Sequence, residues 1–202
     1  MLKLPPSTKL NKQLPKKAIY AKFKLKTVIQ EKFDADVSKI VFINEVSPIT
    51  TNIAKGEHIE SFFVLLVLLK HEQFDEKNIL LLPKLIDQRM LFVLECGKRA
   101  KLAVFHGKLH QTEWMPKADL SIELKGLNFD TIWEHIIVQV GGVEIAQGRT
   151  LEEQIQIDEQ HAKLEKQISS LERQARAEKQ PRRKLEMVQE IKKIEKQIIW
   201  TN

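Results

Sequence analysis

The chain has 202 residues, of which 43% are hydrophobic and 30% charged, and its formal net charge is +6. This length and composition predict one ordinary folded domain with an appendage and exclude a disordered chain. A single cysteine excludes an internal disulfide framework, and the longest apolar run, 62–69, is far shorter than the roughly 20 residues that span a bilayer. We therefore expect a soluble, cytoplasmic protein that does not enter a membrane.

Positive charge is concentrated at the start of the chain. Residues 1–32 hold nine lysines and one acid, whereas residues 149–202 hold twelve basic and ten acidic residues. The middle of the chain is therefore mildly acidic. A lysine-rich arm can contact phosphate or an acidic protein surface, and the simpler alternative is a set of solvated lysines on an exposed segment.

The first half of the chain predicts helices and strands of different character. Residues 1–15 contain three prolines and are expected to form an extended lead-in. From 16 to 33, apolar residues separated by lysines predict a helix that is interrupted near Leu25. The segment 39–46 is apolar on both faces, and 59–70 is a longer run rich in phenylalanine and valine, so both predict buried strands, the second of them central.

Helices and short strands continue in the second half of the globular part. Asp75 is a candidate N-cap for a helix that Pro83 either kinks or delays. The apolar segments 90–95, 100–106 and 109–114 are separated by glycine-lysine turns and predict a three-stranded meander.

The strongest helical pattern of the globular part lies at 129–140. Apolar residues there repeat at i, i+3, i+4, i+7 and i+8, with Asn128 or Asp130 as N-cap and two glycines at the end. Strands in pairs and triplets, with few helices between them, predict an α+β domain over 16–146 with a mainly antiparallel or mixed sheet flanked by helices.

Residues 149–200 predict an antiparallel helical hairpin, a coiled coil folded at Pro181. Apolar residues recur at alternating spacings of four and three among Glu, Lys, Gln and Arg, which is the pattern of a coiled-coil seam. Proline disfavours helix at the residue before it and is tolerated in the first turn of a second helix. The predicted seam consists of Ile157, Leu164, Ile168, Leu171, Leu185, Val188, Ile191 and Ile198, and His161, Ala175 and Ile194 lie on the same stripes.

Apolar residues also occur outside this seam. Packing of one arm on the other accounts for a single stripe on each helix. The residues beyond it are Ile155, Met187, Ile199 and Trp200. They indicate a further surface for a partner protein or for a second copy of the chain.

No motif identifies a reaction or a cofactor. The glycine-rich nucleotide loops and the nucleophile elbow are missing from the sequence, and Cys96 ends a strand with no activating group nearby. His106, His110 and Glu113 have the residue types of a metal site, but a glycine-lysine turn between the histidines means that they need not converge. We assign no catalytic, cofactor-binding or metal-binding residue and expect no cofactor.

A metal-dependent nuclease is kept as an alternative. Such an enzyme needs carboxylates that converge on a divalent ion. The nearest approach in this sequence is Asp87 with Glu95 and Lys98, where the lysine comes one position too late to share a face of the strand with Glu95.

DNA binding is a second alternative, based on clustered basic residues. Lysine-rich contacts would bind phosphates without reading base sequence, and their affinity would fall steeply with salt. Tyr20 and Phe23 lie among the lysines and could stack on bases, although Phe23 also fits a core anchor. The candidate contacts are Lys12, Lys16, Lys17, Lys22, Lys24, Lys26, Arg182 and Arg183.

Short motifs along nearly the whole chain carry a family resemblance. They are Leu4-Pro5 with Ser7-Thr8, Ser47-Pro48, Phe92-Val93-Leu94-Glu95, Thr112-Glu113-Trp114 and Glu178-Lys179-Gln180. In these the chain resembles an uncharacterised bacterial family, a domain of unknown function whose members are often encoded beside DNA methyltransferases and helicases of restriction or phage-defence type. The resemblance implies an accessory role in such a system and supplies no catalytic residues.

Our first hypothesis is therefore a non-enzymatic accessory or adaptor subunit. Its α+β body would dock on a DNA methyltransferase or helicase, and its hairpin would reach a second surface or form a homo-oligomer. DNA binding by the lysine arm and a divergent nuclease are the alternatives.

Overall fold

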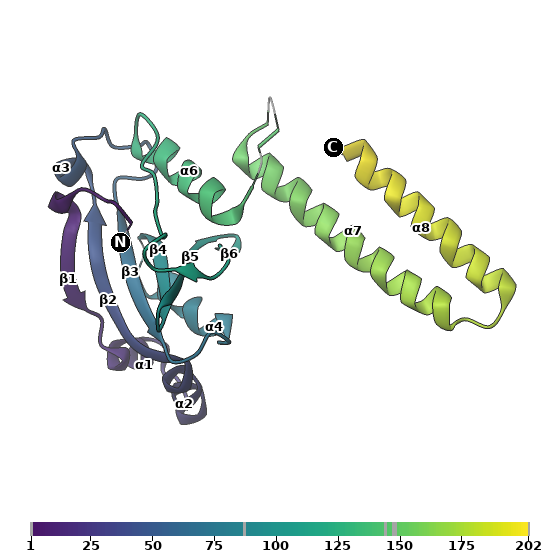
Figure 1. Ribbon diagram of the computed structural model, residues 1–202, viewed down its shortest axis with the longest axis horizontal. Coiled ribbons are helices and arrows are strands. Elements are labelled where there is room, and N and C mark those ends of the chain that lie inside the picture. Colours follow the sequence, from purple (N-terminus) through teal and green to yellow (C-terminus); the bar gives the residue numbers. More distant parts are fainter. Residues whose placement is uncertain (1, 87, 144, 147–148, 202) are drawn as a thin grey trace. The chain divides into compact units, whose positions relative to one another are not determined.

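The computed structural model describes residues 2–86, 88–143, 145–146 and 149–201, with the side chains of 199–201 left out. The chain divides into two compact units, 1–143 and 144–202. Figure 1 shows the first unit, called the body below, as a sheet with helices, and the second as a pair of long helices.

The body is built on one mixed sheet. Among the described residues, seven strands join it in the order β1-β2-β3-β4-β5-β6, with β7 paired to β5. Every pair is antiparallel except β3 with β4, which is parallel. The predicted α+β class is thus confirmed. The strands are β1 (Lys9–Gln13), β2 (Val37–Val46), β3 (Phe62–Leu69), β4 (Arg89–Cys96), β5 (Arg99–His106), β6 (Lys108–Gln111) and β7 (Met115–Pro116).

Short helices carry the chain from β3 across to its parallel neighbour. The predicted helix after Asp75 is two pieces, α4 (Glu76–Ile79) and α5 (Leu81–Leu85). Asp75 caps the first, since its side chain accepts from the backbone N–H of Lys77. Pro83 lies in the first turn of the second, where its missing donor is tolerated, so the chain restarts there instead of continuing one helix.

Helices cover both faces of the sheet. On one face α1 (Lys16–Phe23), α2 (Thr27–Asp36), α4 and α5 enclose a core that contains the fully buried Phe33, Leu65 and Phe92. The predicted interruption near Leu25 is present, because Lys24 adopts a left-handed conformation that ends α1. Figure 1 shows α1, α2 and α4 near one end of the strands.

The other face is covered by α6 (Phe129–Gly141), which packs on β5 and β6. The ring of Phe62 contacts Phe129 and Trp133, with centroid distances of 6.2 and 5.3 Å. The helix begins with the predicted cap, Asn128, and the left-handed Gly142 follows its end. These contacts anchor α6 to the central strand β3.

The first residues differ from the predicted lead-in. Lys9–Gln13 is strand β1 at the sheet edge, preceded by the 3-10 helix η1 (Pro6–Thr8). The amide of Asn44 on β2 donates to the Thr8 hydroxyl at 2.7 Å, and Leu2 is fully buried. This strand is exposed at four of its five positions, so it lacks the apolar alternation by which strands are recognised.

Candidate functional site

The second unit contains the predicted hairpin. Its helices are α7 (Leu151–Ala177) and α8 (Pro181–Thr201). Thr150 caps α7 in a capping box: its N–H donates to the Glu153 carboxylate at 2.9 Å, and its hydroxyl accepts from the Glu153 N–H at 3.3 Å. Hydrogen bonding of the Glu153 carboxylate to Thr150, chiefly to its backbone N–H, lowers the pKa of Glu153 below its ordinary value. Pro181 begins α8, as its position after the break predicts.

The seam between the two helices is as predicted on α7 and shifted on α8. The predicted α7 residues, Ile157, Leu164, Ile168 and Leu171, are all half-buried, and Ala175 is buried. On α8 the covered residues are Met187, Ile191, Ile194 and Ile198, spaced by four, three and four.

Leu185 and Val188 are therefore corrections to the predicted seam. Their exposed fractions are 58% and 37%, whereas Ile194 is only 8% exposed. Each residue turns the helix by about 100°, so these two side chains share a stripe that lies beside the covered one. The sequence of α8 contains two overlapping apolar stripes, and the one that continues to Ile194 packs on α7.

The exposed stripe of Leu185 and Val188 borders a groove between α7 and α8. This groove encloses about 360 Å³, and Ala175, Val188 and Ile191 give it an apolar floor. Charged residues of both signs form its rim: Glu172, Arg176, Lys184, Lys192 and Glu195. An apolar floor between charged rims is the surface on which an amphipathic helix packs.

The predicted nucleic-acid contacts fall into different environments. Lys12, Lys17, Lys22, Lys24 and Lys26 are exposed, and none of them forms an ion pair within the part of the chain that the structure describes. Arg182 and Arg183 are exposed at the start of α8, in the other unit, where Arg182 lies 3.5 Å from Glu186.

Lys16 has a structural role instead. Its ammonium donates to the Asp34 carboxylate and, at 2.9 Å, to the carbonyl of Val37. The Tyr20 hydroxyl donates to the same carboxylate at 2.7 Å, and its ring lies edge-on to Phe33. Desolvation acts to raise the pKa of Asp34, but these two donors lower it overall. The pKa of Tyr20 is raised, because its hydroxyl is desolvated by burial and donates to the Asp34 carboxylate. Tyr20 is thus held within the body rather than presented to a base.

Of the candidate residues for metal and nuclease chemistry, those that the structure describes do not gather as a metal site. His110 is buried, and its Nε2 faces the carbonyl of His106 at 3.2 Å. Glu95 pairs with Lys117 at 2.7 Å, and Asp87 lies outside the described residues. Within the described part of the chain no three histidine, cysteine or acidic side chains gather as a metal site, and no helix there is long and apolar enough to cross a membrane.

At the carboxyl ends of β3 and β4, polar side chains satisfy one another. This edge of a parallel pair is where many α/β proteins bind ligands. Here Asp36 accepts from the Asn78 amide at 2.6 Å and the Asp75 N–H at 2.9 Å, and it lies 3.4 Å from His71. A network closed in this way stabilises the end of the sheet.

The amino ends of β3 and β4 are different, because an open cavity of about 530 Å³ lies beside them. Its walls come from the loop before β3, from α5 and from the start of β4. Polar side chains line one part, and apolar ones form its floor. The lining consists of His58, Ile59, Glu60, Ser61, Pro83, Lys84, Ile86, Gln88, Arg89, Met90 and Phe105.

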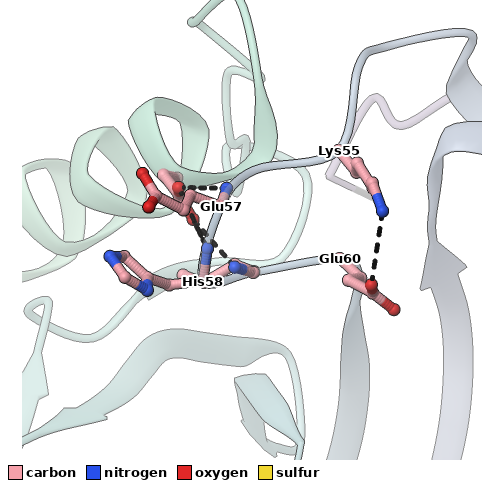
Figure 2. A network of polar contacts seen from close by, with 6 residues as sticks. Lys55, Glu57, His58 and Glu60 are labelled. Atoms are coloured by element: carbon pink, nitrogen blue, oxygen red, sulfur yellow. Dashed lines mark hydrogen bonds and ion pairs between the residues drawn. The ribbon is translucent and has the colours of Figure 1, made fainter.

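The loop wall of this cavity is pinned by Asp130 in the first turn of α6. Its carboxylate accepts from the backbone N–H groups of Glu57, His58 and Ile59 at 2.6, 3.2 and 2.8 Å (Figure 2). Desolvation acts to raise the pKa of Asp130, but these three donors lower it overall. In Figure 2 the Glu60 side chain is turned toward Lys55, 3.9 Å away, and the His58 ring points the opposite way. The sequence marked Asp130 only as a possible cap, since its partners are some 70 residues away.

Comparison with models of protein families identifies a family for the chain. The model of a family described as a domain of unknown function (DUF4391) matches residues 2–198. No curated protein and no solved structure matches the chain. Since the matched range extends through α7 and most of α8, the hairpin is part of the family domain and not an addition to it.

Proposed function

The chain belongs to the DUF4391 family, and from that premise we propose that it is a non-enzymatic accessory subunit that binds a partner protein through its helical hairpin. One observation carries the proposal. The apolar Leu185 and Val188 remain exposed on α8 beside the groove, in a hairpin that covers its other stripe. Fully burying an exposed side chain of this size is worth about 1.5–3 kcal/mol, and a covering partner would gain part of that from each residue, because both are already partly covered.

The groove favours an amphipathic helix as the bound segment. Its floor of Ala175, Val188 and Ile191 accepts the apolar side chains of a third helix in the manner of a coiled coil. The rim offers cations at Lys184 and Lys192 and anions elsewhere, so complementary charges would fix the direction of the incoming helix.

We further propose that the partner is a DNA methyltransferase or helicase of a bacterial restriction or phage-defence system. Support comes from the resemblance of the chain's short motifs to a family often encoded beside such enzymes. An accessory subunit of this kind would place or regulate the enzyme without adding chemistry of its own.

Co-purification tests the proposal with defined components. The full chain is co-expressed with the methyltransferase or the helicase from the same source, as wild type and as the Leu185→Asp, Val188→Asp double variant. Both positions are exposed, so we expect loss of the complex with the helical circular dichroism unchanged. The control, Gln189→Asp with Lys193→Gln, makes the same change in charge at exposed positions outside the groove lining and should retain the complex.

Two outcomes would contradict this function. Equal recovery of the enzyme with both double variants would remove the groove as the binding surface. A wild-type chain that binds neither enzyme and is a dimer by sedimentation, with the Leu185→Asp, Val188→Asp variant monomeric, would assign the groove to a second copy.

DNA binding by the lysine arm is a second candidate, favoured by five exposed lysines of residues 12–26 that form no ion pair with a described residue. The test replaces Lys17, Lys22, Lys24 and Lys26 by Gln and leaves the structural Lys16 in place. Binding through phosphate contacts predicts that the wild type loses affinity steeply with salt and that the variant binds weakly with a shallower dependence. Equal affinities of the wild type and the variant for DNA would exclude the lysine arm as the DNA-binding surface.

A further inference from the structure

We propose that the cavity at the amino ends of β3 and β4 binds a phosphate monoester that carries a planar aromatic ring: a nucleotide, or the 5′-phosphorylated end of a nucleic-acid strand. This inference is independent of the hairpin's role, because every residue that carries it belongs to the body.

Two cations at the cavity favour a phosphate. Arg89, at the start of β4, and Lys84, in α5, are both exposed at the cavity, and neither forms an ion pair with any residue that the structure describes. Arginine can bind a phosphate through two parallel hydrogen bonds, and lysine adds a point charge.

The remaining polar groups of the lining agree with this assignment. Ser61 and Gln88 supply neutral donors, and His58 supplies an imidazole. The acidic side chain of the described lining, Glu60, is turned toward Lys55 (Figure 2), which offsets its charge. Among the described lining residues, Lys84 and Arg89 therefore remain as cations for a ligand.

The loop that carries His58 is held in position before any ligand arrives. Asp130 already accepts the three N–H groups of this loop, so the phosphate would be bound by side chains and not by the loop backbone. A wall fixed in this way loses little conformational entropy on binding.

The floor fits the planar part of the ligand. Ile59 and Met90 are buried there, and Phe105 is half-buried and offers part of its ring. Stacking on an aromatic ring stabilises a bound base by about 1–3 kcal/mol. The volume of about 530 Å³ lies within the roughly 300–1,000 Å³ that is usual for small-molecule sites.

Calorimetric titration of the full chain tests the site with named probes. These are adenosine 5′-monophosphate, adenosine, inorganic phosphate, and a short single-stranded oligonucleotide with either a 5′-phosphate or a 5′-hydroxyl. We expect the monophosphate to bind at least tenfold more tightly than adenosine or inorganic phosphate. A preference for the 5′-phosphorylated oligonucleotide over the monophosphate would identify a strand end as the ligand, and the reverse order a free nucleotide.

Substitutions in the lining test whether the ligand binds in this cavity. The Lys84→Gln, Arg89→Gln double variant should weaken binding of the monophosphate at least tenfold, whereas Lys39→Gln with Lys98→Gln, the same charge change at exposed positions elsewhere on the body, should not. Phe105→Leu should weaken the monophosphate and leave inorganic phosphate unchanged. The proposal is overturned if no probe binds, if phosphate binds as tightly as the monophosphate, or if both double variants bind like wild type with unchanged melting temperatures.

Discussion

The carboxylate of Asp130 occupies the space in which any residue other than glycine would carry its side chain at position 56. A Cβ added to Gly56 would lie 2.3 Å from Oδ1 and 2.7 Å from Oδ2 of Asp130. Gly56 is therefore required for the close approach that lets three consecutive N–H groups reach one carboxylate. The loop and the helix α6 are joined at this contact.

Replacing Gly56 by Ala should destabilise the body by about 1–3 kcal/mol, because the new methyl group overlaps a carboxylate held by its own hydrogen bonds. The free energy of unfolding from urea denaturation measures the effect. Lys55→Ala, at the neighbouring exposed position, is the control and should stay within about 0.5 kcal/mol of wild type. Equal stability of the two variants would show that the loop moves freely away from α6.

Asp130 should also contribute to the pH dependence of stability. Its folded-state pKa is lowered below the ordinary 3.8, so its contribution is present above that value and is lost as the pH falls through the lowered pKa. The stability difference between wild type and Asp130→Asn should then be larger at about pH 6 than at about pH 3. Comparison with the variant removes the shared effect of the other acidic groups. A difference that does not change with pH would contradict the assigned hydrogen bonds.

The shifted seam predicts unequal effects of two similar changes on α8. Ile194→Ala removes a buried side chain and should cost about 2 kcal/mol or more, whereas Leu185→Ala should change stability by less than about 0.5 kcal/mol. Amide hydrogen exchange in the full chain reports on α8 directly. Protection of α8 from exchange should fall in Ile194→Ala and not in Leu185→Ala. Loss of protection in Leu185→Ala alone would instead support the seam expected from the sequence.

The lysines of the N-terminal arm should separate into structural and surface residues. Lys16→Gln leaves Asp34 without its cation and weakens the bond to the Val37 carbonyl, so thermal stability should fall. Lys17→Gln, at the adjacent exposed position, should leave the melting temperature unchanged. Equal effects would mean that the ion pair with Asp34 contributes nothing to folding.

Features encoded locally could be predicted from the sequence. The Asn128 cap and apolar face of α6, the Asp75 cap and the central strand β3 each depend on residues close together in the chain. The break before Pro181 depends on proline chemistry alone. In each case no distant contact had to be known.

Features set by distant contacts could not be predicted. The strand β1 is polar and joins the sheet only because β2 offers an edge. The contact of Asp130 with the loop at 57–59, and with it the cavity wall, joins segments far apart in sequence. On α8, Leu185, Val188 and Ile191 share one helical spacing and Met187, Ile191 and Ile194 another, so the start of the seam depends on packing against α7. Sequence patterns therefore located the hairpin but not its exposed side.

From β1 to β6, each strand lies beside the strand that precedes it in the chain. No strand on this path has to enter between two that are already paired, so each can add to a growing edge as it leaves the ribosome. The parallel step from β3 to β4 needs only the short helices α4 and α5 between them. The sheet can thus assemble in the order of synthesis, with α6 covering its second face afterwards.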